Sequence, residues 1–332
     1  MSHSNKEIKN INRRKFSSKI MTGFGLITLP NLALSAVKKL HKPVKLGLIA
    51  DLHHDVMHDG AKRLGSFISS MKKESPDALI QMGDFAYPNE KNKKITEAFQ
   101  SAHPTTLHVL GNHEIDDGHS FEQVVKLWGM KGRYYTHNIN GLNIIVLDGN
   151  EKKANHKGGY PSYIGNEQAE WLREQLKKLD GPIIILSHQG LAGPWSIDNA
   201  KEIQEILKSH QDKIIMTLNG HNHIDHIIKI GSIINFHINS ASYKWVGGDH
   251  RHKSYSDTIH SKFPYIEYTC PYKDPLYTTV TINPSSKNIE IKGIMSEWVG
   301  KSPAQIGQEI HPGLSDGKEI CPHIRTRRVK RS

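Results

Sequence analysis

The sequence predicts an α/β protein in which short buried strands alternate with helices. Five apolar runs have the length and composition of buried strands, and segments with the apolar spacing of amphipathic helices lie between them. Asp, Asn or His follows each run within three residues, as expected where strands end at the edge of a sheet that carries a site. The runs are residues 44–50, 78–82, 107–110, 183–186 and 214–218.

The helices are predicted from apolar spacing. In residues 60–73, four apolar residues from Leu64 to Met71 recur at i, i+3, i+4 and i+7, and Pro76 follows the end of the segment. A strand, a helix and a further strand form a parallel crossover unit, which places active residues outside the carboxyl ends of the strands. Further helices are expected at residues 95–101, 121–130, 166–179 and 198–209.

Turn residues predict three hairpins. Asn140-Gly141 joins residues 133–138 to 142–147, because Asn-Gly suits a tight hairpin turn, and this hairpin is expected to mark the crossing to a second sheet. The other two hairpins pair residues 224–230 with 233–239 and residues 277–282 with 288–293.

The polar residues after the five strands are of metal-binding types. Asp, His and Asn suit a divalent or trivalent ion held by mixed nitrogen and oxygen ligands. Any one of them alone could be a helix cap or a surface residue, but five such blocks in order favour a site. The seven donors are Asp51, His53, Asp84, Asn112, His188, His221 and His223.

Seven donors are too many for one tetrahedral site, and they suit two ions about 3.5–4 Å apart that share a carboxylate. Asp84 is the expected bridge, because it lies in the middle of the set and Gly83 leaves no side chain before it. Such a pair of ions lowers the pKa of a bound water and clamps the attacking and leaving oxygens of a phosphoryl transfer. His113 follows a donor directly, and is therefore the candidate to stabilise or protonate the leaving oxygen.

The pattern Asp-x-His, Gly-Asp, Gly-Asn-His-Glu, His and Gly-His-x-His over residues 45–223 resembles the calcineurin-like metallophosphoesterase superfamily. The resemblance implies a four-layer α/β/β/α sandwich of two mixed sheets with the metals at its rim. No ligand position of the family pattern is missing. It implies one metal bound by Asp51, His53, Asp84 and His223, and a second bound by Asp84, Asn112, His188 and His221.

The resemblance implies a dinuclear-metal phosphohydrolase that cleaves a small-molecule phosphodiester, pyrophosphate or phosphomonoester. A hydroxide bridging the metals attacks phosphorus, and His113 assists the leaving oxygen. The metals are expected to be Mn, Fe or Zn, since all of them share such ligands. Within the superfamily the chain most resembles the bacterial branch near class III cyclic-nucleotide phosphodiesterases and Mn-dependent ADP-ribose/CDP-alcohol diphosphatases. The features that carry this resemblance are the Asp-x-His block and the loop 158–160 before the segment 164–168.

Three alternatives stay open. Residues 83–87 also match the Gly-Asp-x-x-Tyr block of purple acid phosphatases, in which the tyrosine binds ferric iron, so Tyr87 is a second candidate ligand; those enzymes lack the histidine present here as His53. A catalytically inactive scaffold of the same fold would be expected to have lost ligands. A nuclease would need a basic groove.

The N-terminus resembles a twin-arginine export signal, expected at residues 1–36. Residues 12–16 hold Arg13 and Arg14, an uncharged stretch follows from 20 to 36, and small residues allow cleavage after Ser35 or Ala36. The resemblance implies the twin-arginine translocation machinery as a partner and a periplasmic location. The stretch is too short and broken for a stable membrane span. Cleavage after Ala36 would prefer a small residue at the position of Leu34. The alternative that the uncleaved signal forms an inner-membrane anchor therefore stays open.

The charge of +11 is concentrated at the two ends of the chain. Residues 1–36 carry +5 and the last eight residues carry another +5, so the body is near neutral and no nucleic-acid partner is expected. After a linker at 37–43, the metallophosphoesterase domain is expected at residues 44–300, with an irregular insert at about 246–275 that is a candidate lid or interface. Residues 301–332 form the expected basic tail. The sequence does not decide whether Cys270 and Cys321 form a disulfide.

Several further groups are expected around the metals without a ligand role. These groups either contact the substrate or belong to the core. The histidine-rich patch in the insert, His250 to His252, either contacts an anionic substrate or is solvated. These groups are His54, Asp55, His58, Tyr87, His119, His156, Tyr160, Tyr243 and Trp245.

Overall fold

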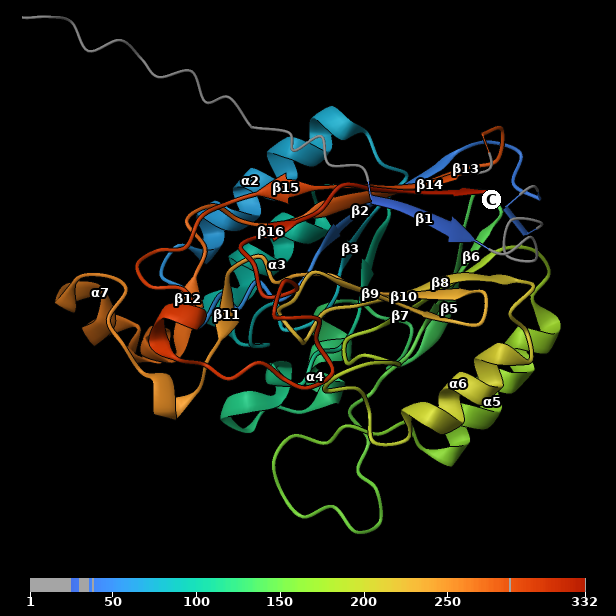
Figure 1. Ribbon diagram of the computed structural model, residues 1–332. Coiled ribbons are helices and arrows are strands. Elements are labelled where there is room, and N and C mark those ends of the chain that lie inside the picture. Colours follow the sequence, from blue (N-terminus) through green and yellow to red (C-terminus); the bar gives the residue numbers. More distant parts are fainter. Residues whose placement is uncertain (1–24, 30–35, 38, 287, 332) are drawn as a thin grey trace, which may run out of the picture.

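Two large mixed sheets lie face to face in the computed structural model, which describes residues 25–29, 36–37, 39–286 and 288–331 (Figure 1). The first sheet has the order β1 (Gly25–Leu29), β17 (Arg327–Arg331), β14 (Asn288–Lys292), β13 (Thr278–Asn283), β2 (Val44–Ile49), β3 (Ala78–Gln81) and β4 (Thr106–His108). The second has the order β5 (Tyr135–Ile139), β6 (Leu142–Val146), β7 (Ile183–Ser187), β8 (Ile214–Asn219), β10 (Ile233–His237) and β9 (His226–Ile230). The α/β class and the two mixed sheets are confirmed.

Helices cover the outer faces of both sheets (Figure 1). On the first sheet lie α2 (Gly60–Glu74), α3 (Lys93–Gln100) and α4 (Phe121–Leu127), and on the second lie α5 (Asn166–Lys178) and α6 (Ala200–Lys208). Alternate residues of each strand separate the layers, because successive side chains point to opposite faces. In β7, for example, Ile184 and Leu186 pack between the sheets, whereas Ile183 and Ile185 pack against the outer helices. The molecule therefore has the four-layer arrangement expected from the sequence.

Parallel pairing brings the carboxyl ends of the central strands to one edge. Strands β2, β3 and β4 run parallel in one sheet, and β6, β7 and β8 run parallel in the other. The loops that follow β2, β3, β4, β7 and β8 carry the seven predicted donors, so the sandwich gathers them at its rim.

The insert is more regular than the sequence suggested. It contains α7 (Asp257–Lys262), a 3₁₀ turn at Pro264–Tyr268 and strand β12 (Thr269–Pro271), which pairs antiparallel with β11 (Tyr243–Trp245). Cys270 and Cys321 are both buried and free. Two further short strands, β15 (Ile294–Met295) and β16 (His323–Ile324), pair with each other.

The segment expected as a basic tail contributes a strand to the first sheet. Residues 327–331 form β17, which pairs antiparallel with β14 and parallel with β1. The alternation explains the difference, because Val329 is buried between the sheets and Arg327 makes two 2.7 Å hydrogen bonds to the buried carboxylate of Asp225. The arginines that suggested a basic tail thus belong to a strand, in which Val329 packs between the sheets and Arg327 forms an internal ion pair with Asp225.

The predicted twin-arginine core at residues 12–16 lies outside the described residues. Within the expected signal segment, residues 25–29 form β1. No helix in the described part of the chain is long and apolar enough to cross a membrane.

Replacing Arg327 by alanine is expected to lower the free energy of unfolding by about 3 kcal/mol, because it leaves Asp225 buried with only the weaker contact to Arg325. Arg328→Ala is the matched control. Its partner Glu290 is exposed, and a change below about 1 kcal/mol is expected. Urea unfolding followed by circular dichroism measures both variants, and equal losses would contradict an internal role for Arg327.

Candidate metal centre

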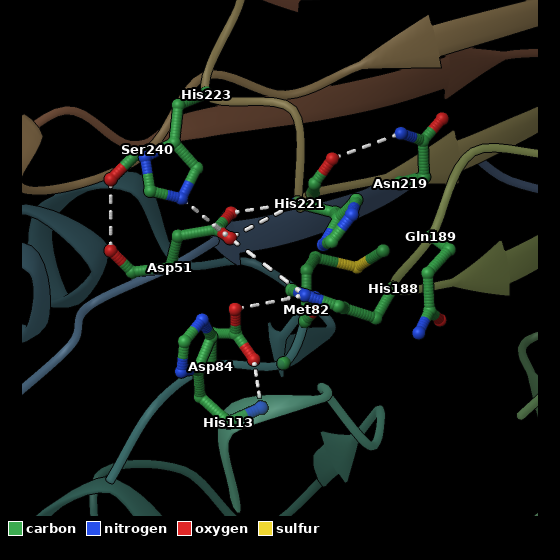
Figure 2. A network of polar contacts seen from close by, with 12 residues as sticks. Asp51, Met82, Asp84, His113, His188, Gln189, Asn219, His221, His223 and Ser240 are labelled. Carbon is green, nitrogen blue, oxygen red and sulfur yellow. Dashed lines mark hydrogen bonds and ion pairs between the residues drawn. The ribbon is translucent and has the colours of Figure 1, made fainter. Parts of the chain in front are cut away.

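The structure brings six of the seven predicted donors together in two neighbouring groups. Figure 2 shows five of these six, namely Asp51, Asp84, His188, His221 and His223. Within each of the two groups that consist of carboxylates and histidines, the candidate ligand atoms all lie within 4.8 Å of one another. Asn112 lines the cavity that these groups share. The first group is Asp51, His53 and His223, and the second is Asp84, His188 and His221.

Asp84 lies between the two groups. Its Oδ2 is 3.1 Å from Nε2 of His188 in one group and 3.6 Å from Nε2 of His53 in the other. Asp51 faces the same space, with its Oδ1 3.2 Å from Nε2 of His223 and 4.0 Å from Nε2 of His188 (Figure 2). A single carboxylate that faces both groups is what a bridging ligand requires.

Five of the seven donors have left-handed backbone conformations, which are uncommon outside glycine. Each costs on the order of 1–3 kcal/mol and persists only where the surrounding structure enforces it, typically at functional sites. Backbone hydrogen bonds hold two of these turns, from the N–H of Asp51 to the carbonyl of Gly83 and from the N–H of His53 to the carbonyl of Asp84. The φ angles are 52° at Asp51, 47° at His53, 51° at Asp84, 64° at His221 and 48° at His223.

Glycines precede three of the donors because another donor occupies the space of a Cβ. A Cβ at Gly83 would lie 2.4 Å from Nδ1 of His188, and one at Gly111 would lie 2.2 Å from Oδ1 of Asp84. A Cβ at Gly220 would lie 2.5 Å from Oδ2 of Asp51. The repeated Gly-Asp, Gly-Asn and Gly-His pattern thus has a packing cause, since each glycine lets two ligand-bearing turns approach each other.

The donor set fits a pair of metal ions. The amide of Asn112 is 1% exposed, and neither of its polar atoms has a hydrogen-bond partner among the described residues. Burying an unpaired amide is unfavourable, and a metal ion that accepts its oxygen as a ligand would remove that cost. Nδ1 of His188 lies 2.8 Å from the carbonyl of Met82, which orients Nε2 toward Asp84.

The electrostatics of the site also favour cations. Burial raises the pKa of Asp51 to about 6. Burial acts in the same direction on Asp84, but His188 and His113 hold the pKa of that carboxyl well below its usual range. Burial acts to lower the pKa of His188, whereas the Asp84 and Asp51 carboxylates raise it to about 10. Two buried carboxylates so close together need positive charge beside them, which metal ions supply.

His113 belongs to a hydrogen-bonded network at the wall of the cavity. Its backbone N–H donates to Oδ1 of Asp84, and its Nδ1 lies 2.6 Å from Oδ2 of Asp116. The hydroxyl of Tyr160 donates to the same carboxylate at 2.8 Å. Burial acts to lower the pKa of His113, whereas Asp84 and Asp116 raise it to about 8. The network leaves Nε2 as the ring nitrogen available to a ligand.

The donors open into a cavity of about 970 Å³. Of the groups expected around the metals, five line it, namely Asp55, Tyr87, Tyr160, Tyr243 and Trp245. Sequence analysis missed Asp116, Trp195 and Lys244, which also line it. A signal for Asp116 was present, because an acid three residues after His113 faces it across one 3₁₀ turn.

Other candidate groups make contacts elsewhere. The ring of His58 packs against Tyr255, and His119 contacts the ring of Tyr87. Nε2 of His156 lies 3.1 Å from the carbonyl of Gly159. In the insert, Nδ1 of His250 contacts the carbonyl of Ile306 and Nδ1 of His252 contacts the carbonyl of His250. Nδ1 of His54 is buried and finds no hydrogen-bond partner among the residues described.

Comparison with protein families decides the class of the chain. A model of the calcineurin-like phosphoesterases matches residues 44–225, more than half of the sequence. The chain belongs to the calcineurin-like phosphoesterase family. Members of this family are metal-dependent hydrolases that use divalent metals, and the two donor groups are in keeping with that chemistry. No curated protein sequence matches the chain.

Solved structures share the fold at low sequence identity. A dimetal phosphatase from Danio rerio is 14% identical, with a TM-score of 0.54 over 77% of this chain and 98% of the phosphatase. GAP50, described as the anchor in the inner membrane complex of Plasmodium, is 13% identical, with a TM-score of 0.50 over 84% of this chain and 93% of GAP50. Both support the metallophosphoesterase fold.

Replacing Gly220 by alanine is expected to lower metal affinity by about 10-fold or more, because the new Cβ displaces the carboxylate of Asp51. Gly65→Ala is the matched control, since its Cβ would project from α2 into open space. Metal titration followed by elemental analysis tests both variants, with circular dichroism to verify folding. Unchanged metal content in folded Gly220→Ala protein would contradict the packing role of this glycine.

Proposed function

We propose that the protein is a dinuclear metal-dependent phosphohydrolase that cleaves a phosphomonoester, phosphodiester or pyrophosphate bond of a small molecule. The position of Asp84 between the two donor groups carries the proposal, since it allows one carboxylate to serve two ions. Asp51, His53, Asp84 and His223 would hold one ion. Asp84, Asn112, His188 and His221 would hold the other.

When bound, the two ions supply Lewis acidity that activates a water molecule and neutralises charge on the phosphoryl oxygens. The residues of the chain fix the positions of the candidate ligands. The left-handed turns at Asp51 and Asp84 fix the two carboxylates, and the Met82 carbonyl orients His188. Mn, Fe and Zn are all compatible with such mixed nitrogen and oxygen donors.

His113 is the proposed catalytic residue for the leaving oxygen. Its Nδ1 is held by Asp116, which in turn accepts a hydrogen bond from Tyr160. The Asp116 carboxylate accepts a hydrogen bond from Nδ1–H, fixes the ring plane and favours the imidazolium form, in which Nε2 also carries a proton that it can donate as the ester bond breaks. Asp116 and Tyr160 are positioning residues in this scheme.

A non-catalytic scaffold is the competing function, because the structural neighbour GAP50 is described as an anchor. The full donor set in this chain favours the hydrolase, since a scaffold has no need to keep seven ligand-type residues converging on buried turns. Metal content distinguishes the two, with about two ions per chain expected for the hydrolase.

We also propose that the twin-arginine translocation machinery exports the protein to the periplasm. The sequence of residues 12–16 and the uncharged stretch after it support the proposal. An anchor formed by an uncleaved signal is its alternative, and the N-terminal sequence of the protein recovered from periplasmic and membrane fractions distinguishes them. The near-neutral body supports a small-molecule substrate over a nucleic acid.

Asp84→Asn and His188→Ala are each expected to reduce phosphoester hydrolysis by about 100-fold or more, because each removes a metal ligand. His210→Ala, just past the carboxyl end of α6, is the control and should retain activity. The assay uses an aryl monoester, an aryl diester, cyclic AMP, ADP-ribose and a glycerophosphodiester, with Mn, Fe and Zn in turn. Full activity in folded, metal-loaded ligand variants would exclude the proposed mechanism.

Asp116→Asn is expected to slow hydrolysis by about 10- to 100-fold for esters with alkyl leaving groups and much less for 4-nitrophenyl esters. A 4-nitrophenolate ion leaves without a proton, whereas an alkoxide needs one from His113. The neighbouring change Asp117→Asn removes the same charge and should leave the ratio of the two rates unchanged. A loss in Asp116→Asn that is equal for both kinds of ester would indicate a structural role alone.

A further inference from the structure

Two exposed tryptophans form a wall of the cavity beyond the metal ligands. Trp195 and Trp245 line the same cavity as His53 and His223, and 43% and 42% of their surfaces remain exposed. They come from different parts of the chain, since Trp195 lies in the loop after β7 and Trp245 ends β11. Indole rings of this size are usually buried or engaged, so two of them facing one cavity suggest a ligand.

Trp195 is held in place against the preference of its backbone. Its φ is 50°, which is an outlier for a bulky side chain. The loop that carries it is fixed by the hydrogen bond from the N–H of Ile197 to the carbonyl of Gly190, and by the one from Nδ2 of Asn222 to the carbonyl of Pro194. Asn222 lies between His221 and His223, so the turn that bears two candidate ligands also positions this indole.

A buried cation accompanies the aromatic wall. Nζ of Lys244 lies 4.8 Å from the centre of the Trp195 ring, and the side chain is 6% exposed. Nζ donates to the carbonyl of Asn222 at 2.9 Å, and no carboxylate of the described residues lies within 4.0 Å of it. The ring of His311 contacts Trp195 at 4.6 Å. An ammonium group at this position disfavours a positively charged ligand beside the same indole.

Trp245 presents the second aromatic surface. Its ring stacks on Tyr268 at 5.7 Å with an interplanar angle of 9°, which fixes its plane. Gln308 donates to the carbonyl of Trp245, while its own Oε1 is buried and has no hydrogen-bond partner in the part of the chain that the structure describes. Two residues earlier on β11, Tyr243 stacks on the candidate ligand His53 at 4.9 Å. Strand β11 therefore leads from the metal centre to the aromatic wall.

We propose that Trp195 and Trp245 form a stacking subsite for a planar aromatic ring carried by the phosphoester substrate. The inference rests on the proposed function, because the phosphoryl group of the same molecule must reach the metal ligands. The ring is neutral or bears an anionic group that Lys244 binds, and where the ring edge has a hydrogen-bond donor, Oε1 of Gln308 accepts a hydrogen bond from it. A carbocyclic aryl alcohol and a heteroaromatic base share this chemistry.

Phosphonates test the subsite without turnover, because a phosphoester hydrolase does not cleave their carbon–phosphorus bond. The probes are methylphosphonate, 1-naphthylmethylphosphonate, the phosphonate analogue of AMP and (2-trimethylammonioethyl)phosphonate. Calorimetry on the metal-loaded protein measures affinity, and quenching of tryptophan fluorescence reports stacking. The naphthyl compound, the AMP analogue or both should bind about 10-fold or more tightly than methylphosphonate, and the cationic compound should not.

Trp195→Ala and Trp245→Ala should each reduce this affinity ratio by about 5-fold or more. Trp171→Ala is the matched control, because Trp171 packs on Tyr134 outside the cavity. Because the two tryptophans lie in different elements, a folding defect in one variant leaves the other variant to test the subsite. A preference for the naphthyl compound alone would assign the subsite to aryl alcohols, and a preference for the AMP analogue alone would assign it to heteroaromatic bases.

Equal affinity for all four phosphonates, or a ratio that survives both tryptophan changes, would overturn the subsite. Failure of the proposed function gives a different result. In that case the ring preference and the fluorescence quenching persist, while no phosphoester is hydrolysed with any metal and removing the metals with EDTA leaves methylphosphonate binding unchanged.

Discussion

The position of the Asp84 carboxylate is the constraint on which the rest of the site depends. It is buried at the end of β3, faces a histidine of each donor group, and accepts the backbone N–H of His113. Each of these contacts needs the left-handed turn that follows Gly83, and that turn needs the absence of a side chain at Gly83. Burial alone would disfavour this charge, but His188 and His113 hold the pKa of Asp84 well below its usual range, so the fold keeps an ionised carboxylate between the two donor groups.

The sandwich makes this arrangement possible because it joins two parallel sets of strands at one edge. Asp51, Asp84 and Asn112 arrive from the first sheet, and His188, His221 and His223 arrive from the second. A slip of one residue in either sheet would turn the side chains at the strand ends to the wrong face. The fully buried central strands, such as β7 and β8 of the second sheet, fix that register through their apolar packing.

The strands and their donors could be predicted from sequence because both signals are local. An apolar run of four to seven residues followed by Asp, Asn or His needs no tertiary information. The left-handed turns could not be predicted, since Asp51 and His223 are not glycines and only their neighbours enforce the conformation. Strand β17 was missed for a related reason. Arg327 looks solvated until Asp225, about one hundred residues away, is placed beside it.

The residues beyond the family match show why the common chemistry was easier to predict than selectivity. The match ends at residue 225, and it contains every candidate ligand. Lys244, Trp245 and Gln308 follow it, and they line one cavity with Trp195, which the turn around Asn222 joins to Lys244 of β11 through two hydrogen bonds. The candidate ligands follow the ends of strands, so their positions can be read from the sequence. The aromatic wall depends on contacts between segments far apart in the sequence, and no regular spacing marks its residues. In the proposed function, the part of the cavity that would distinguish one phosphoester from another therefore lies in loops and in β11, beside the candidate metal centre at the strand ends.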